Sequence, residues 1–424
     1  MDKVIVISID ALISDDIAEF GKLPNMAKLL SGRVAVAEKI HCIYPTYTYP
    51  CHTSIMTGCY PDKHGIYHND VFDPLSDHDK WFWFRDAVKM PTMIDAAAKA
   101  GLTTAAVAWP VMGACSADYL IAEIWTENEK DDPEAVFDRA DSPAVKHIFD
   151  KNRHLLDWMR TPGLDYFAAA SASDIIREFS PDLTFIHLSY LDHQRHNNGQ
   201  ETEKNLNAIR FIDERLGEII RAAEDAGIYD DTTFFILGDH GHMNVSRIFN
   251  VNKALADRGY ITLDDSGRVI DWKLFVHSAS FSGHVYSNGI SEDDAVRVLE
   301  EIQKEYPGNI ERIMTRFEAE ELYHLDGPFT LVLEAENNVI FGKDLTGSIS
   351  SYPEKGCYKF SDSTHGFAPE KGPNPPFIAA GKRAKDSAFI KHARLVDEAP
   401  TIMSIFGLTL DGIDGRKLDL IEEE

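Results

Sequence analysis

Short apolar runs alternate with longer segments of helical spacing along most of the chain. The runs Val4–Ile9, Leu183–Ser189 and Thr232–Leu237 are largely apolar, which is typical of strands buried on both faces of a sheet. Amphipathic segments lie between such runs, and Lys204–Ala226 ends at Gly227 as a helix does. This alternation predicts an α/β fold with a mostly parallel central sheet.

The same reading places further elements on both sides of these runs. Helices are expected at Pro24–Leu30, Pro91–Ala100, Tyr166–Phe179 and Val396–Phe406, and strands at Val34–Ala37, Thr103–Trp109 and Phe377–Ala380. The acidic segment 127–150 contains Pro133 and Pro143, so it is predicted to be a solvated loop or a set of short helices.

From about residue 247 to residue 351 the predicted helices and strands are shorter than in the rest of the chain. A helix is expected at Ser291–Tyr306, with Ser291 and Asp294 spaced as in a capping box, followed by strands at Phe329–Leu333 and Val339–Phe341. We therefore predict a catalytic α/β domain formed by residues 1–246 and 352–424, with residues 247–351 inserted as a smaller α+β lid.

Length and charge narrow the classes of function. A chain of 424 residues is long enough for one large core and a smaller unit. Its net charge of -27 disfavours binding to nucleic acid polymers, whereas a small phosphate compound can bind where a metal ion supplies positive charge. No apolar run reaches the length of a membrane helix and the start does not resemble a signal peptide, so we expect no membrane partner and a cytoplasmic location. The five cysteines show no CxxC pair, and free thiols are expected.

Three aspartates follow predicted buried strands within a few residues. They are Asp10, Asp192 and Asp239. Ligands of parallel α/β sheets bind at the carboxyl ends of the strands, so these carboxylates are expected to meet at one edge. A single aspartate in such a turn is usually structural, but three at equivalent places indicate a site.

Histidines accompany these carboxylates. His196 lies four residues after Asp192, His240 directly follows Asp239, and His365 precedes a glycine. Carboxylate oxygen and imidazole nitrogen are ligands for zinc and related divalent ions, and a pair of ions about 3.5–4 Å apart needs roughly this number of ligands. The sequence thus predicts two divalent metal ions. The remaining histidines singled out are interpreted as packing, surface or supporting residues: His41, His52, His64, His68, His187 and His242.

The stretch Tyr44–Asn69 supplies a candidate nucleophile. Thr48 is expected near the N-cap of a short helix that ends at Gly58, where its hydroxyl would face the positive helix end that favours phosphate oxygens. Most threonines at this position only cap a helix, and that reading stays open from the stretch alone.

The motifs taken together resemble the nucleotide pyrophosphatase/phosphodiesterase branch of the alkaline phosphatase superfamily. The resemblance covers nearly the whole chain in order, through Val6-Ile7-Ser8-Ile9-Asp10, Pro45-Thr46-Tyr47-Thr48-Tyr49-Pro50-Cys51-His52, Thr57-Gly58-Cys59-Tyr60-Pro61, His64-Gly65-Ile66, Asp192-x-x-x-His196, Asp239-His240-Gly241 and Thr364-His365-Gly366. It implies an alkaline-phosphatase-like three-layer sandwich and two zinc ions, with manganese or iron also possible. One zinc would be held by Asp192, His196 and His365, and the other by Asp10, Asp239 and His240.

The resemblance also implies roles for the stretch around Thr48. Thr48 would bridge toward the second ion as nucleophile, and Asn69 would donate a hydrogen bond to a phosphoryl oxygen. Tyr49 keeps the aromatic ring that stacks on a nucleobase in relatives. Cys51 departs from the family's Phe-Pro-Asn-His, and a small buried thiol is its expected form. The aromatic run Trp81–Phe84 fits a buried cluster or a cleft wall.

Three functions follow from this site. The first is hydrolysis of phosphodiester or pyrophosphate bonds in small nucleotides through a phospho-threonine intermediate. The second is phosphonoacetate hydrolysis, which needs basic side chains such as Lys63, Arg85 and Lys89 near the site. The third is a non-enzymatic metal or nucleotide sensor, although such proteins usually lose a ligand or the nucleophile. The natural substrate and the oligomeric state stay open.

Overall fold

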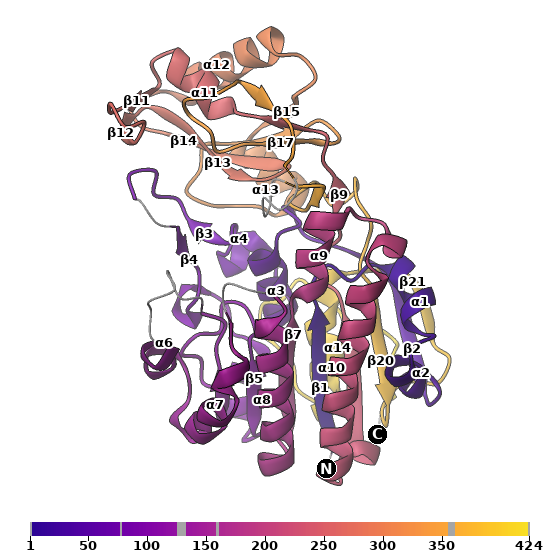
Figure 1. The fold of residues 1–424 in the computed structure, drawn as a ribbon. Coiled ribbons are helices and arrows are strands. Elements are labelled where there is room, and N and C mark those ends of the chain that lie inside the picture. The colour runs from indigo at the N-terminus through magenta and orange to yellow at the C-terminus, as the bar shows by residue number, and fades with distance from the viewer. Residues whose placement is uncertain (1, 77–78, 125–132, 158–160, 355–360, 423–424) are drawn as a thin grey trace.

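One sheet forms the core of the computed structural model, which describes residues 2–76, 79–124, 133–157, 161–354 and 361–422 (Figure 1). In the described part this sheet has eight strands, in the order β21 (Phe389–Arg394), β2 (Val34–His41), β20 (Phe377–Gly381), β8 (Thr232–Leu237), β1 (Lys3–Ile9), β7 (Leu183–Leu188), β5 (Thr104–Val107) and β6 (Tyr119–Ile121). β20 is antiparallel to both of its neighbours, and the other neighbouring pairs are parallel. The prediction of a mostly parallel sheet is confirmed.

Helices cover both faces of this sheet, as the continuously apolar strands require. On β1, Val4 and Val6 face one side and Ile5 and Ile7 the other, and each set joins a separate hydrophobic core. One core is closed by α3 (Thr48–Thr57), α5 (Met93–Lys99) and α14 (Glu398–Met403), and the other by α2 (Pro24–Leu30), α8 (Gly163–Phe179) and α10 (Leu206–Asp225). The predicted three-layer α/β sandwich is therefore present, with α8 and α10 packed side by side (Figure 1).

The acidic segment differs in part from its prediction. Its described part forms the short helices α6 (Pro133–Ala140) and α7 (Lys146–Asn152), one of the two predicted forms. These helices are not simply solvated, because Phe137 and Phe149 are buried against the sheet domain. Residues 127–132 lie outside the described residues.

A second body lies beyond the carboxyl edge of the main sheet (Figure 1). Its sheet has the order β13 (Leu274–Ala279), β14 (Ser282–Ser287), β16 (Leu331–Ala335) and β15 (Ile310–Thr315), and α11 (Val251–Asp257) and α12 (Glu292–Glu305) pack on it around a core of their own. Ser291 caps α12 by accepting a hydrogen bond from the backbone of Asp294. The α+β character of this lid matches its expectation, while the boundaries at residues 247 and 351 stay a prediction.

Short elements complete the described part. The remaining helices are α1 (Ile17–Phe20), α4 (Pro61–His64), α9 (Tyr190–Asn198) and α13 (Arg316–Tyr323), and the remaining strands are β3 (Asp70–Val71), β4 (Lys80–Trp81), β9 (Met243–Asn244), β10 (Arg247–Phe249), β11 (Ile261–Leu263), β12 (Val269–Trp272), β17 (Val339–Phe341), β18 (Ser350–Ser351) and β19 (Ser363–Thr364). β9 and β19 pair where the chain enters and leaves the lid.

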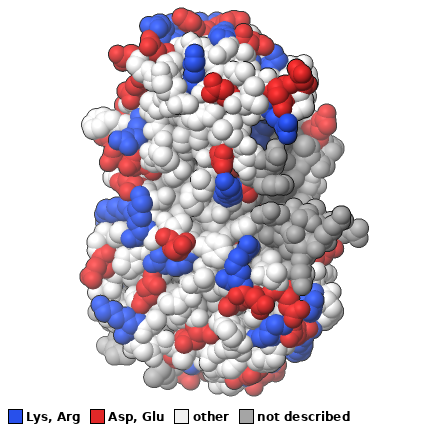
Figure 2. All heavy atoms as spheres, turned by 90° about the vertical axis from the view of Figure 1, so that its left-hand side faces the viewer, with Lys and Arg blue, Asp and Glu red and all other residues white. Residues whose placement is uncertain are grey.

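Three further observations concern membrane-spanning helices, surface charge and the cysteines. No helix within the described ranges has both the length and the apolar character needed to cross a bilayer. Acidic and basic side chains are interspersed over the face shown in Figure 2. Cys42, Cys51, Cys59 and Cys115 carry free thiols, as expected, and Cys357 lies outside the described residues.

The loop after β19 passes very close to the lid. Gly366 has a φ of +92°, and a Cβ placed there would lie 1.9 Å from the backbone oxygen of Ala279. We expect Gly366→Ala to lower the free energy of unfolding by about 2 kcal/mol or more, because a backbone carbonyl has to move and the left-handed conformation disfavours a side chain. Urea unfolding measures the change.

A matched control separates strain from the steric clash. Gly259 has a similar positive φ of +76°, but a Cβ there would meet nothing within 4 Å. Gly259→Ala is expected to cost about 1 kcal/mol, for the conformational strain alone. Equal costs for the two variants would contradict the close approach at Gly366.

Candidate active site

Three adjacent parallel strands deliver the predicted carboxylates to one edge of the sheet. β1 lies between β7 and β8, and its chain continues into Asp10. β7 leads into α9, which carries Asp192 and His196 one turn apart and therefore on one face. β8 leads into Asp239 and His240. Parallel strands end at the same edge, so residues far apart in sequence meet there.

The first ligand group is centred on the carboxylate of Asp192. Its Oδ2 lies 3.4 Å from His196 Nε2 and its Oδ1 lies 3.8 Å from His365 Nε2. The Nδ1 atoms of the two imidazoles face backbone oxygens, those of Ser363 at 2.9 Å and Thr46 at 3.3 Å. A carbonyl only accepts, so each Nδ1 carries a proton and each Nε2 is the ring atom turned toward Asp192.

The second group surrounds His240. Its Nε2 lies 3.4 Å from Asp10 Oδ1, 3.2 Å from Asp239 Oδ2 and 3.1 Å from Thr48 Oγ1. Ligand atoms of Asp10, Asp192 and His240 all lie within 4.8 Å of one another, so Asp192 connects the two groups. The structure thus brings together all six predicted ligands and the predicted nucleophile.

Burial makes it unfavourable for the neighbouring carboxylates of this cluster to be charged at the same time. Asp10, Asp192 and Asp239 are at most 5% exposed. The pKa of Asp10 is raised to about 7, first by burial and then by the charge of Asp192, and the pKa of Asp239 is raised well above its usual range by burial and by Asp10. For Asp192 burial also acts upward, but the His196 and His242 imidazoles hold its pKa well below the usual range. Bound cations would relieve the repulsion among these groups.

The donor set fits divalent metal ions. Asp10 Oδ1 and Asp239 Oδ2 are buried and accept no hydrogen bond within the described part of the chain. Burial lowers the pKa of His240 to about 3 and that of His365 well below its usual range, so both imidazoles are neutral at neutral pH and offer lone pairs. Unsatisfied carboxylate oxygens beside neutral imidazoles are the ligand set of zinc, manganese and iron sites.

Thr48 stands at the start of α3, one position later than expected. The N-cap is Tyr47 and Thr48 is the first helical residue, and the helix ends as predicted at Gly58, which has a φ of +68°. The Thr48 hydroxyl lies 3.1 Å from His240 Nε2 in the ligand cluster. The hydroxyl thus lies against a predicted ligand, while its role as nucleophile stays a prediction.

Asn69 faces the same helix start. Its Oδ1 accepts a hydrogen bond of 2.9 Å from the backbone N–H of Tyr49, which fixes the orientation of the amide because an N–H can only donate. This contact limits the backbone donors at the helix start. The Tyr49 amide is engaged and Pro50 has no N–H, so the helix start offers fewer donors to a phosphate than a typical helix does.

The aromatic residues near Thr48 are packed rather than open. Tyr49 is 1% exposed and contacts Trp81 edge-on, with ring centroids 5.3 Å apart. Stacking of a nucleobase on Tyr49 stays a prediction. Trp81 and its neighbours up to Phe84 pack against the sheet core as an aromatic cluster, and Cys51 is a fully buried thiol.

Three histidines outside the predicted ligand set contact the cluster, which agrees with a supporting role, one of the roles expected for them. His242 Nε2 lies 2.7 Å from Asp192 Oδ1, a hydrogen-bond distance that is shorter than the roughly 3.4 Å between two ligands of one tetrahedral zinc. His52 lies one turn after Thr48, donates from Nδ1 to the Thr48 carbonyl at 2.9 Å, and receives the Ser8 hydroxyl at Nε2. His187 Nε2 lies 3.2 Å from Asp10 Oδ2.

His187 orients Asp10 from within the sheet. Burial opposes its charge, but the Asp10 and Glu123 carboxylates outweigh burial and raise the pKa of His187 well above its usual range, so both ring nitrogens donate. We expect His187→Gln to weaken metal binding by about 10- to 100-fold, as loss of a residue behind a metal ligand does. Metal titration of the chelator-treated protein measures it.

His64 provides the control for that substitution. Its ring is equally buried but contacts Ser54 Oγ and the Ile66 backbone, away from the carboxylates. His64→Gln should leave metal affinity within about twofold while changing stability. Equal metal affinity in the His187 and His64 variants would show that Asp10 does not depend on His187.

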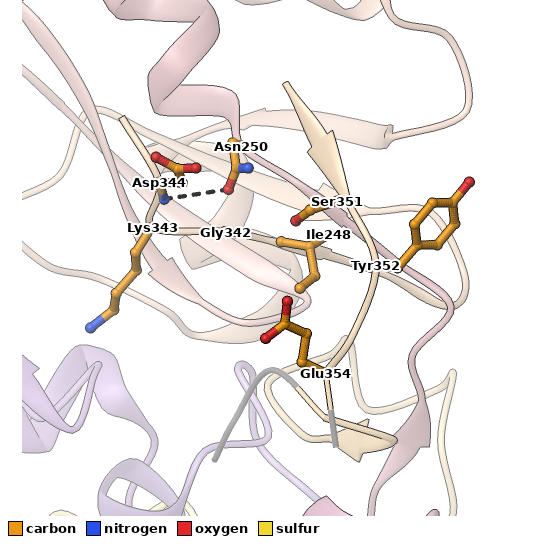
Figure 3. A pocket seen from close by; sticks show the side chains of 8 residues that line it. All are labelled: Ile248, Asn250, Gly342, Lys343, Asp344, Ser351, Tyr352 and Glu354. Carbon is orange, nitrogen blue, oxygen red and sulfur yellow. Dashed lines mark hydrogen bonds between the residues drawn. The ribbon is translucent and has the colours of Figure 1, made fainter. Parts of the chain in front are cut away.

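A pocket of about 360 Å³ lies in the lid, away from this cluster. Figure 3 shows its lining, in which the Asp344 backbone N–H lies 3.4 Å from Asn250 Oδ1. Its residues come from β10, β18 and the segment after β17, and none of the predicted site residues is among them. The candidate site is therefore the buried cluster at the sheet edge.

Known proteins share both the sequence pattern and the fold. The family model described as type I phosphodiesterase / nucleotide pyrophosphatase matches residues 4–341. Bis(5'-adenosyl)-triphosphatase ENPP4 of Bos taurus is 24% identical over 275 residues, which cover 62% of this chain and 52% of the relative. Ectonucleotide pyrophosphatase/phosphodiesterase family member 3 of Bos taurus is 24% identical over 253 residues, covering 57% of this chain and 25% of the relative. The chain spans about half the length, or less, of these curated relatives.

Solved structures show the fold over the full chain. Murine ectonucleotide pyrophosphatase / phosphodiesterase 5 matches with a TM-score of 0.70 and 18% identity, covering 99% of this chain and 100% of that one. An inactive variant of the same murine protein in complex with AMP matches with a TM-score of 0.70 and 17% identity, with both chains covered completely. This likeness and the ordered motifs agree with the alkaline-phosphatase-like fold. By the match over residues 4–341, the chain belongs to the type I phosphodiesterase / nucleotide pyrophosphatase family.

Proposed function

We propose that this protein hydrolyses phosphodiester or pyrophosphate bonds in small nucleotides, with Thr48 as the nucleophile. One observation carries the proposal: the Thr48 hydroxyl lies 3.1 Å from His240, within a buried cluster that holds a complete set of carboxylate and imidazole ligands. One ion would be held by Asp192, His196 and His365, and the other by Asp10, Asp239 and His240. Two divalent ions there supply Lewis acidity, which favours a deprotonated threonine oxygen and a charged leaving oxygen.

The chain's own groups have separable tasks. Thr48 Oγ1 forms the new bond to phosphorus while the bond to the leaving oxygen breaks, and the leaving alcohol or phosphate takes up a proton. Water then cleaves the phospho-threonine ester, which restores the hydroxyl and releases the nucleoside monophosphate. Asn69, whose oxygen is engaged by the Tyr49 N–H, has its NH₂ group to donate to a phosphoryl oxygen.

The substrate class rests on the family relatives. The ENPP4 relative is named for hydrolysis of a bis(5'-adenosyl) triphosphate, and the murine family member 5 was solved with AMP. That murine complex is of an inactive variant in which a threonine is replaced by alanine, which agrees with a threonine nucleophile in the family. Zinc is the metal we propose first, with manganese and iron as alternatives.

A comparison of three substrates tests the proposal. The zinc-loaded protein is assayed with bis-p-nitrophenyl phosphate, diadenosine triphosphate and p-nitrophenyl phosphate. We expect a kcat/KM for the two diester-type substrates at least about 10²-fold above that for the monoester. A preference for the monoester would overturn the diesterase assignment, and absence of turnover with a full metal complement would favour the sensor.

The phosphonate alternative receives less support from the structure. Lys63 pairs with Asp414 and Arg85 pairs with Asp95, so both side chains are engaged outside the cluster. Lys89 packs its aliphatic chain against Gly65. A carboxylate-bearing phosphonate would need cations that reach the reacting phosphorus. Release of phosphate from phosphonoacetate would nevertheless restore this alternative at once.

A further inference from the structure

A second cluster of imidazole and carboxylate groups lies between the catalytic domain and the lid. His68 and Asp70 flank Asn69 in the segment that leads into β3. His277 on β13 and His284 on β14 are directly paired across the two lid strands, so their side chains share one face. All four residues are at most 9% exposed.

Three of these residues hold possible ligand atoms close to one another. Asp70 Oδ1 lies 2.9 Å from His68 Nδ1 and Asp70 Oδ2 lies 3.0 Å from His277 Nε2. The two imidazole rings stack with centroids 3.8 Å apart, and the three ligand atoms lie within 4.8 Å of one another. The two distances run to different oxygens of Asp70, so the carboxylate would bind an ion through both, and adjacent ligands of an ion with bonds of about 2.1 Å are separated by about 3.0 Å.

The hydrogen bonds of His68 leave its Nδ1 atom facing the Asp70 carboxylate with no proton assigned between them. Its Nε2 lies 3.2 Å from the Ser278 carbonyl and must carry the proton there, because a carbonyl only accepts. The backbone N–H of Asp70 also points at Nδ1, at 3.2 Å, and a cation bound by Nδ1 would replace this long hydrogen bond. The same Nδ1 faces the Asp70 carboxylate at 2.9 Å, and two acceptors at that distance need a proton or a cation between them.

Buried ring nitrogens beside this contact give a second, independent observation. His284 is fully buried, and neither of its ring nitrogens has a hydrogen-bond partner among the described residues. His277 Nδ1 is in the same condition. The His284 ring lies 5.6 Å from that of His68 and stacks on Phe329, so it stands at the rim of the cluster. Buried imidazoles are costly unless their lone pairs are used.

We propose that His68, Asp70 and His277 form a third divalent-cation site, with His284 as an adjacent basic group. The site would take an ion that accepts imidazole and carboxylate ligands in six-coordinate geometry, such as Mn²⁺, or Zn²⁺ with added water. Two of its ligands come from the catalytic domain and one from the lid, so the ion ties the two together. Because Asn69 lies between two ligands, the ion also holds the segment that presents Asn69 to the substrate.

The site is separate from the candidate active site. The Tyr47 ring lies between the two clusters, with its centroid 5.1 Å from that of His68 and 4.9 Å from that of His365. No residue belongs to both sets of ligands. The proposal therefore does not rest on the proposed hydrolysis, and its test reads metal content instead of turnover.

Metal counting on the 424-residue chain tests the site. Chelator-treated protein is reloaded with Mn²⁺ or Zn²⁺, passed through a desalting column and analysed by mass spectrometry for metal. We expect about three ions per chain, and about two in His277→Gln, with the two active-site ions retained. His147→Gln is the control, since His147 forms a surface pair with Glu178 at 2.9 Å, outside both clusters, and should keep all three ions.

A variant without the active-site ligands makes the count unambiguous. Asp192→Asn combined with Asp239→Asn should retain about one ion, and adding His277→Gln should remove it. This comparison also covers a His277→Gln chain that folds poorly, because binding by the double variant is informative by itself. Two ions in the unmodified chain and none in the double variant would overturn the proposal.

Discussion

Replacing Thr48 with alanine is expected to lower the turnover of a diester substrate by at least about 10³-fold, equivalent to roughly 4 kcal/mol of transition-state stabilisation. The substitution removes the oxygen that lies 3.1 Å from His240 and leaves every predicted metal ligand in place. Metal content should therefore stay at its original value. Steady-state rates with bis-p-nitrophenyl phosphate and metal analysis of the same preparation measure the two quantities together.

The same helix offers a matched control. Thr53 is also buried, but its hydroxyl donates to the Tyr49 carbonyl within α3 at 2.8 Å. Thr53→Ala is expected to change kcat/KM by less than about threefold, because that hydroxyl does not reach the ligand cluster. Thr48→Ser, which keeps an oxygen at the position, should recover part of the rate. A Thr48→Ala variant with more than about a tenth of the original activity would remove Thr48 from the reaction.

The main sheet could be predicted because its strands are buried on both faces. Val4–Ile9 is apolar at every position except Ser8, so neither face could meet solvent and helices had to cover both. Whether a strand runs parallel or antiparallel to its neighbours has no comparable pattern in the sequence. The run Phe377–Ala380 has the same apolar character as its neighbours, although β20 is antiparallel to them. Its direction is set by where the chain returns from the lid, which local sequence does not encode.

The predicted ligands were accessible to sequence reasoning because each follows a strand or belongs to a compact motif. The supporting residues were less accessible. His187 sits inside β7 and reads as an ordinary strand residue, and only its pairing with Ser8 places it behind Asp10. The contact between Tyr49 and Asn69 likewise joins residues 20 apart through a turn that leaves no periodic pattern. Such contacts depend on register and loop geometry, so they appear only in the folded chain.

Asp192→Asn is the second substitution with a large expected effect, because this carboxylate connects the two ligand groups. Its oxygens face His196, His365 and His242, and it also lies within ligand distance of Asp10 and His240. The amide keeps the shape of the side chain but removes the negative charge that divalent ions require. We expect the loss of at least one bound ion and a decrease in kcat/KM of about 10³-fold or more.

Gln194→Ala tests whether the effect of Asp192→Asn is specific. Gln194 lies on the same helix two residues further on, where its side chain contacts Asn198 rather than the ligand cluster, so both metal content and rate should stay near their original values.

Excess zinc separates two possible roles of Asp192. If Asp192 serves only to orient neighbouring side chains, saturating zinc should restore the rate of the asparagine variant, because the remaining ligands would bind the ion once its concentration exceeds the weakened dissociation constant. If the charge of Asp192 is itself needed to hold and tune the ion, the site will fill but the rate will stay low, since the leaving oxygen then meets a weakly held and misplaced cation. We expect the second result.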